Sequence, residues 1–167
     1  HIVSAYAGSL GLTLGQCKTA EKSNEITAIP ELLDSLLLTG CVVTIDAMGC
    51  QKAIAAQIVS KDADYVLAVK DNQPTLAHCV ETAFGSIPTP DAALKQGLVS
   101  YFETIEKDHG RIETRRYTVL QNLACMDPFR EDWPSLTAFI KVESTRDIKG
   151  QVSTETRYYI SSRAGTA

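Results

Sequence analysis

The sequence lacks the patterns that identify several common classes of protein. No apolar run approaches the length of about eighteen residues that a membrane-spanning helix needs. No charged-then-apolar leader is present, so a secretory signal is not expected. The GxGxxG fingerprint of dinucleotide-binding folds and the GxSxG elbow of hydrolases are both missing. We therefore expect neither a membrane-spanning protein nor an enzyme of these two classes.

Positive charge is scarce, above all in the first part of the chain. The 167 residues carry a formal charge of −4, and all seven arginines lie after residue 94. The strong basic excess that usually marks a nucleic-acid-binding domain is therefore absent. Any contact with phosphate groups should be local and should lie mostly in the C-terminal half.

Metal-binding and disulfide patterns are missing as well. The five cysteines are odd in number and include no CxxC pair, and the three histidines show no ligand spacing. We therefore expect no zinc site and a reduced, cytoplasmic setting.

The hydrophobic pattern divides the chain into two parts of different texture. With 44 % hydrophobic residues, the chain is long and apolar enough to form a real core. The first part predicts a β-hairpin and then alternating helices and strands. The expected ranges are 1–7 and 11–18 for the hairpin, 29–37 for a helix that Gly40 ends, 41–45 and 65–69 for strands, and 54–59 and 75–84 for helices. The second part predicts antiparallel strands at 101–105, 115–120, 136–143 and 154–160.

The strands at 41–45 and 65–69 should pair in parallel, since a helix connects them. Nearly unbroken apolar strands are typical of parallel pairs that are covered on both faces, and the crossover should be right-handed. Ligands of open α/β sheets bind at the carboxyl ends of such strands. This edge of the sheet is therefore the first place to look for a functional site.

Asp46 stands at that edge, directly after the strand at 41–45. A carboxylate in this position can hold Mg²⁺ together with substrate phosphates. The alternative is that Asp46 only caps the following turn or helix. Glu25 is a candidate neighbour, and a solvated loop acid is an equally good interpretation of it. The sequence alone does not decide between the two roles of Asp46 or between the two interpretations of Glu25.

Two polar segments could contact nucleic acid. Residues 70–73, Lys-Asp-Asn-Gln, follow the second parallel strand and should reach the same edge as Asp46. The alternative for this segment is a polar loop with a helix cap at Asn72. Residues 109–116 form the densest basic patch.

Alternation along the basic patch places Arg111, Glu113 and Arg115 on one strand face. That face could bind phosphates, with Glu113 orienting the two arginines. The alternative is a surface ladder whose charges satisfy one another.

Five segments, taken in order, resemble the H-repeat-associated transposases, which belong to the DDE transposases of insertion sequences. These segments are Glu21–Leu33, Thr44–Lys52, Ala68–Gln73, His109–Arg111 and Arg157–Ser162. They are spread over nearly the whole chain, and several motifs in a fixed order are more specific than any single one.

The resemblance implies an α/β fold in two parts. Residues 1–94 would form a partial RNase H-like mixed sheet with flanking helices, and residues 95–167 an antiparallel β-rich insertion with a return strand toward the core. Family members hold two Mg²⁺ or Mn²⁺ ions with three carboxylates, Asp, Asp and Glu. The ions activate water or a 3′-hydroxyl for attack on a DNA phosphodiester. Asp46 matches the second Asp and would be the catalytic and metal-binding residue.

The other two carboxylates of the family are not expected in this chain. The first Asp ends a strand upstream of the segment that resembles residues 1–5, and the Glu lies on a helix beyond Arg157–Ser162. Glu113 is not assigned to that role because residues 111–120 predict a strand. We therefore expect a central transposase fragment that binds no metal pair and does not cleave DNA alone. Its free strand edges could pair two copies into a homodimer.

The resemblance also implies DNA, both transposon ends and target, as the partner in a bacterial cytoplasm. The residues expected to contact DNA are Lys22, Asn24, Lys70, Asn72, Gln73, His109, Arg111 and Arg115. The main alternative is a truncated remnant of a mobile element that binds DNA without catalysis. A phosphoacceptor signalling domain, with Asp46 as acceptor and Lys70 beside it, lacks the acid pair that it needs.

Overall fold

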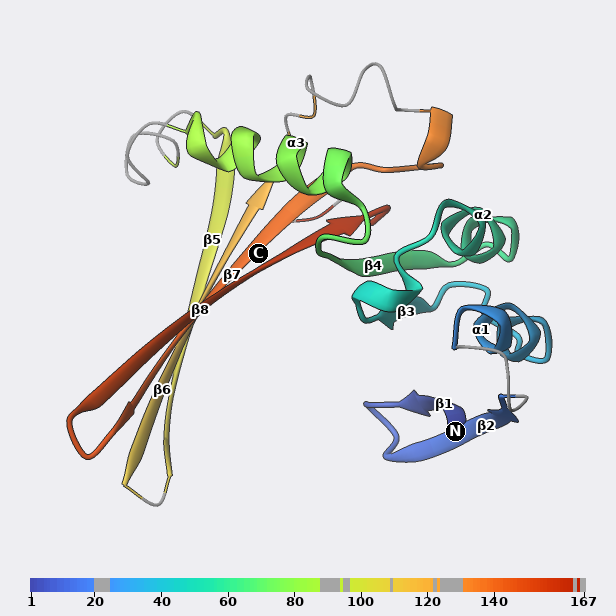
Figure 1. Cartoon of the computed structure of the whole chain (residues 1–167), viewed down its shortest axis with the longest axis horizontal. Coiled ribbons are helices and arrows are strands. Elements are labelled where there is room, and N and C mark those ends of the chain that lie inside the picture. Colours follow the sequence, from blue (N-terminus) through green and yellow to red (C-terminus); the bar gives the residue numbers. More distant parts are fainter. Residues whose placement is uncertain are drawn as a thin grey trace.

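The described part of the chain forms two β-sheets, three α-helices and one short 3-10 helix in a computed structural model (Figure 1). The residues that the structure describes are 1–19, 25–87, 94, 97–108, 110–121, 123, 131–163 and 165. In chain order the elements are β1 (Ile2–Ala7), β2 (Leu12–Lys18), α1 (Glu25–Asp34), β3 (Val42–Ile45), η1 (Ala47–Gly49), α2 (Lys52–Ser60), β4 (Asp64–Val69), α3 (Pro74–Gly85), β5 (Val99–Asp108), β6 (Arg111–Leu120), β7 (Ala138–Ile148) and β8 (Gln151–Ser161). Among these helices, none has the length and apolar character that a bilayer crossing requires.

The N-terminal hairpin is confirmed, and the helix after it begins and ends earlier in the chain than predicted. β1 and β2 pair antiparallel as a separate two-stranded sheet. Helix α1 ends at Asp34 and does not continue toward Gly40, so the apolar Leu37 is left 99 % exposed. Its last turn tightens because the Ser35 hydroxyl donates to the Leu32 carbonyl, 2.7 Å away, in competition with the helical pattern.

The parallel pair is confirmed as β3 and β4, with α2 between them in the chain. The prediction that both faces of the pair are covered is wrong for the described residues. Tyr65 and Leu67 are completely buried on one face, whereas Thr44 is exposed on the other. Val66 and Ala68 on the same open face are only half-buried. The apolar sequences of these two strands therefore do not distinguish strands that are packed on one face from strands that are packed on both.

The second half of the chain joins the same sheet through β8. The strand order is β3-β4-β8-β7-β6-β5, and β8 pairs antiparallel with β4 from Val66 opposite Ser161 to Val69 opposite Tyr158. Each of β5–β8 has 10 or 11 residues, which is longer than the pattern predicted. These four strands, which we call the arm, twist away from the helices (Figure 1). The division into residues 1–94 and 95–167 stays a proposal.

The core lies on the face of β4 that carries Tyr65 and Leu67. α2 contributes Ile54 and Ile58, and β7 and β8 contribute the fully buried Phe139 and Ile160. The backbone N–H of Tyr65 donates to the Ser162 hydroxyl at 2.9 Å, and that hydroxyl donates to the Asp64 carboxylate at 2.9 Å. These bonds fasten the end of β8 to the start of β4. Removing one partner of a buried bond of this kind typically costs about 1–3 kcal/mol.

The cysteines differ in oxidation state. Cys17, Cys41 and Cys50 are free thiols, whereas Cys79 is disulfide-bonded, so the expectation of a fully reduced chain is wrong for that residue. Burial raises the pKa of the Cys50 thiol to about 12, which keeps it protonated at neutral pH.

Gly49, at the end of η1, brings the turn after β3 against helix α1. A Cβ atom on Gly49 would collide with the Ile45 side chain and lie 3.1 Å from Cδ1 of Ile29. Since both neighbours belong to the packed interior, neither can move away freely. Because Gly49 has no side chain, this turn can pack against α1.

We expect Gly49→Ala to lower the free energy of unfolding by about 1–3 kcal/mol, because it overpacks this contact. Gly85→Ala is the matched control, since a Cβ there meets no atom within 4 Å. That variant should be neutral or stabilising by up to about 1 kcal/mol. Urea unfolding followed by circular dichroism measures both, and equal stability of the two variants would contradict the contact.

Candidate active site and the adjoining groove

Asp46 lies where the sequence predicted, exposed at the carboxyl end of β3. Its Oδ1 accepts a hydrogen bond of 3.1 Å from the backbone N–H of Met48 and so caps η1. The capping interpretation is therefore confirmed. It does not exclude a second role, because a carboxylate has two oxygens and accepts several hydrogen bonds. The cap fixes the direction in which this carboxylate points.

Asp46 and Lys70 share one cavity, as expected from the carboxyl ends of two neighbouring parallel strands. The cavity, of about 430 Å³, is called the Asp46 cavity below. Strand β8 adds Arg157 and Tyr159 to its wall. The sequence did not place these two residues here, because their position depends on the register of β8 against β4. The only signal for them was the match of residues 157–162 to a family motif.

The amides of Asn72 and Gln73 connect two loops at this edge. Nδ2 of Asn72 donates to the Ala47 carbonyl at 2.6 Å, and Nε2 of Gln73 donates to the Cys50 carbonyl at 3.0 Å. They hold the turn after β4 against the turn after β3, and thereby fix the distance between Lys70 and Asp46. Their expected contact with DNA stays a prediction.

Three of the residues predicted to contact DNA, Lys22, Asn24 and His109, lie outside the described residues. The same holds for the side chain of Glu25, the candidate neighbour of Asp46.

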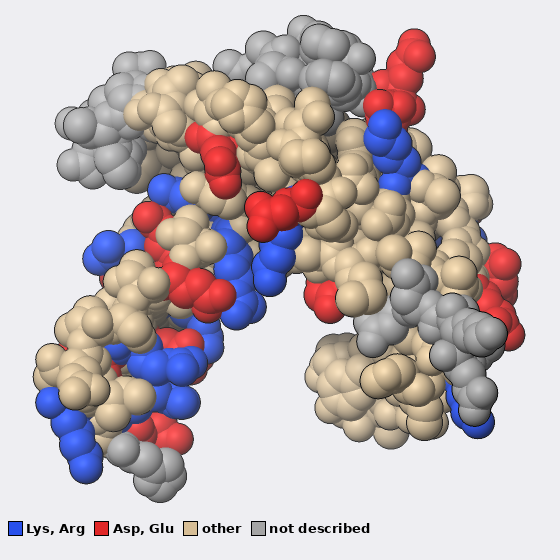
Figure 2. All heavy atoms as spheres, viewed as in Figure 1, with Lys and Arg blue, Asp and Glu red and all other residues tan. Residues whose placement is uncertain are grey.

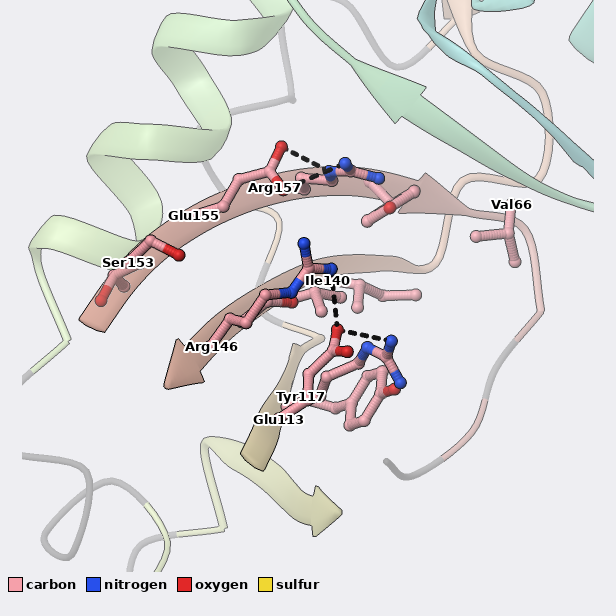
Figure 3. Close-up of a pocket in the computed structure, with 13 residues that line it drawn as sticks. Val66, Glu113, Tyr117, Ile140, Arg146, Ser153, Glu155 and Arg157 are labelled. Carbon is pink, nitrogen blue, oxygen red and sulfur yellow. Dashed lines mark hydrogen bonds and ion pairs between the residues drawn. The ribbon is translucent and has the colours of Figure 1, made fainter. Parts of the chain in front are cut away.

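A second cavity adjoins the first on the open face of the arm. It has a volume of about 580 Å³ and is called the arm groove below (Figure 3). Its lining residues come from four strands and are Val66, Glu113, Arg115, Tyr117, Ile140, Val142, Ser144, Arg146, Ser153, Thr154, Glu155, Arg157 and Tyr159. Val66, Arg157 and Tyr159 line both cavities, so the arm groove runs into the Asp46 cavity.

Glu113 is the centre of a cluster of arginines in the arm groove. It is only 6 % exposed, and its carboxylate lies 2.6 Å from Nη2 of Arg115, 3.7 Å from Nη2 of Arg146 and 3.8 Å from Nε of Arg111. The predicted common face of Arg111, Glu113 and Arg115 is confirmed, and so is the ladder of ion pairs. Arg146 is an additional member that sequence reasoning missed.

Arg157 forms a second charged pair beside this cluster. Its guanidinium donates twice to the Glu155 carboxylate, at 2.8 and 3.0 Å. This hydrogen bonding lowers the pKa of the Glu155 carboxyl, and the charges of Lys70 and Arg146 lower it further. Lys70 from the Asp46 cavity and Arg146 from the arm groove therefore both favour the ionised form of this carboxylate.

The described residues supply one metal ligand at this site and no more. No group of three or more His, Cys, Asp or Glu side chains that could hold an ion is found among them. Asp46 is the single acid in the wall of the Asp46 cavity. A two-metal site needs several oxygen ligands around both ions, so Asp46 fits one ligand of such a site and cannot form it alone.

These features define an α/β protein with an acid at the end of a parallel strand and a cationic groove beside it. Residues 1–166 match the family model described as "Transposase DDE domain". The chain is 45 % identical over 166 residues to "Putative transposase YncI" of Escherichia coli O157:H7, covering 98 % of this chain and 41 % of that protein. The chain therefore belongs to the DDE transposase family, as its motifs indicated.

Two further relatives match nearly the whole chain. The "H repeat-associated putative transposase YhhI" of Escherichia coli K12 is 40 % identical over 171 residues, covering 100 % of this chain and 44 % of that protein. A protein of Xanthobacter autotrophicus, "Uncharacterized protein in dhlA 3'region", is 43 % identical over 162 residues, covering 97 % of this chain and 52 % of that protein. The chain thus spans about half the length of these relatives. No solved structure matches it.

We expect Asn72→Ala to lower the free energy of unfolding by about 1 kcal/mol, because it removes the donor to the Ala47 carbonyl. Asp71→Ala, at the exposed neighbouring position, is the control and should change stability by less than about 0.5 kcal/mol. Thermal unfolding of the two variants measures the difference. If Asn72→Ala is as stable as its control, the amide does not hold the two loops together.

Proposed function

We propose that this chain is the central part of a DDE transposase that cuts DNA strands and joins them to a target. The observation that carries the proposal is the placement of Asp46 in one cavity with Lys70 and Arg157. An acid that ligates a divalent cation and two bases that bind phosphate oxygens would form half of a phosphoryl-transfer site.

Each side chain has a distinct role in this proposal. The Met48 N–H holds Oδ1 of Asp46, so the carboxylate is preorganised to bind a metal ion. Mg²⁺ or Mn²⁺, when bound, stabilises negative charge on the phosphodiester oxygens. Lys70 and Arg157 would bind the phosphate groups and hold the DNA backbone at the carboxyl ends of β3 and β4. Asn72 and Gln73 fix the loop that carries Lys70.

The remaining carboxylates would come from parts of the protein beyond these residues. β3 ends one sheet, the hairpin forms another, and α1 packs against β1, β2 and η1. Among the described residues, β3 and the hairpin therefore each leave a strand edge without a partner near α1, as an RNase H-like core without its first strand should show. We propose that this strand brings the first Asp, and that residues 95–167 are an insertion into the core. The 167 residues alone should then not cleave DNA.

Asp46→Asn in the full-length protein should abolish metal-dependent cleavage of transposon-end DNA, with a loss of at least about a hundredfold, because the carboxylate charge is essential to hold the ion. Asp62→Asn is the matched control, since Asp62 is an exposed acid just before the amino end of β4, whereas Asp46 lies at the carboxyl end of β3. Cleavage of an end-labelled duplex with Mg²⁺ or Mn²⁺ measures both. Full activity of Asp46→Asn would refute the role of this residue.

A DNA-binding remnant without catalysis is the second candidate, and one observation favours it. The described residues contain no set of three metal ligands, but they do contain a groove lined with arginines. Sequencing the locus on both sides separates the two. An open frame that supplies an upstream Asp strand and a downstream Glu helix supports the transposase. Stop codons or frameshifts in either flank support the remnant.

The isolated chain should dimerise through its unpaired strand edges, which are templates for pairing between copies. We expect the mass from light scattering to rise from monomer to dimer as the concentration increases. Val42→Lys, on the end strand of the sheet, should shift the equilibrium toward the monomer, whereas Ser60→Lys at the end of α2 should not. A monomeric mass at every concentration would contradict this pairing.

A further inference from the structure

The open face of the arm differs from its opposite face in how its charges are paired. Alternation along the strands puts Arg115 of β6, Arg146 of β7 and Arg157 of β8 on the open face. The register supports this, because Glu113 lies opposite Arg146 and Val142 lies opposite Arg157. Three arginines on three consecutive strands therefore line one continuous groove.

On the opposite face of the arm, two cations each pair with one acid. Arg116 lies 2.7 Å from the Glu103 carboxylate, and Lys141 lies 3.1 Å from that of Glu143. Lys141 also lies over the ring of Phe84, 5.7 Å from its centroid, where α3 covers the sheet. The charges of Arg116 and Lys141 are therefore paired, and Lys141 is partly covered by α3.

On the open face the pairing is different, because one buried acid is shared. The carboxylate of Glu113 lies near Arg111, Arg115 and Arg146, and Arg115 pairs also with Glu106 at 3.5 Å. The lining of the arm groove holds three arginines, Arg115, Arg146 and Arg157, and two acids, Glu113 and Glu155. The Glu113 side chain is 7 % exposed, whereas those of Arg115 and Arg146 are 33 % and 49 % exposed. The acid is thus hidden beneath guanidinium groups that still have N–H donors facing solvent.

Figure 3 shows Arg146 and Arg157 on neighbouring strands that line the groove, with Glu113 beside Arg146 and Glu155 beside Arg157. Figure 2 shows Lys and Arg side chains of the arm, interspersed with Asp and Glu, along the border of a hollow, with the N-terminal hairpin on its other side. Hydroxyl groups of Ser144, Ser153 and Thr154 also line the groove. Guanidinium and hydroxyl donors on a concave surface are what a phosphodiester backbone recognises.

We propose that the arm groove is a binding site for the phosphate backbone of DNA, which crosses β6, β7 and β8 and continues to Asp46. Glu113 is a positioning residue that holds Arg115 and Arg146 in place for phosphate oxygens. This inference rests on the proposed function, since it assigns the path by which the substrate reaches the candidate active site. Charge complementarity and the continuity of the two cavities are the observations that carry it.

The test is DNA binding by the isolated chain, measured by fluorescence anisotropy with a labelled random duplex of about 30 base pairs, at several salt concentrations from about 0.05 to 0.2 M. Arg115→Gln, Arg146→Gln and Arg157→Gln should each weaken binding by about three- to tenfold. Each should also lower the slope of log K against log salt by about one, because one phosphate contact is lost.

Arg116→Gln is the matched control, because it removes the same charge from the same strand on the opposite face. Its affinity and its salt slope should stay near those of the unmodified chain. If the three groove variants bind DNA as tightly as Arg116→Gln, the arm groove is not the binding site and the proposal is overturned.

The role of Glu113 has a test of its own, in which two explanations predict opposite signs. Glu113→Gln removes a negative charge, so an effect of net charge alone would tighten binding. A positioning role predicts weaker binding and a smaller salt slope, because Arg115 and Arg146 lose their common partner. Circular dichroism must show an intact sheet. Tighter binding with an unchanged fold would overturn the positioning role.

These outcomes are separate from those that test catalysis. If Asp46→Asn still cleaves DNA in the full-length protein, the proposed function fails while the binding results stand. If groove variants match the control, the inference fails whatever the cleavage assay shows.

Discussion

The antiparallel pairing of β8 with β4 is the constraint on which the candidate site depends. Four residue pairs, from Val66 with Ser161 to Val69 with Tyr158, join the arm to the parallel strands. The hydroxyl of Ser162 completes the junction by bonding to the Tyr65 N–H and to the Asp64 carboxylate. Without this pairing Arg157 and Tyr159 would not reach the Asp46 cavity, and the two cavities would not meet. The junction thus turns two parts of the chain into one surface.

Most elements could be predicted from the sequence, because their causes are local. Period-two alternation and turn residues identify the hairpin and the strands of the arm, and helical spacing identifies α2 and α3. The end of α1 could not be predicted, since the apolar spacing continues through Leu36 and Leu37 while Ser35 bonds back to Leu32. Coverage of the parallel pair also escaped prediction. Val66 and Ala68 are apolar and small, and this composition does not distinguish a helix-covered face from the wall of a groove.

The candidate site was predictable only where it depends on strand ends. Asp46 and Lys70 follow directly from two adjacent parallel strands, whose carboxyl ends must meet. The family motifs then gave Asp46 its proposed chemistry. The association of Glu113 with Arg146 depends on the register between β6 and β7, which are separated in the chain by residues 121–137. No local pattern specifies such a register, and so the third arginine of the cluster emerged only from the structure.

The alternation of faces along the arm limits how its length can change in evolution. β7 and β8 meet at a tight connection, Lys149 and Gly150, where both residues have positive φ. An insertion or deletion of a single residue within β7 would turn every side chain beyond it to the other side of the sheet. The Arg146 side chain would then point to the opposite face of the sheet. Glu113 would lose its ion pair with Arg146. Length changes that keep this surface should therefore come as pairs of residues, or be confined to the connection itself.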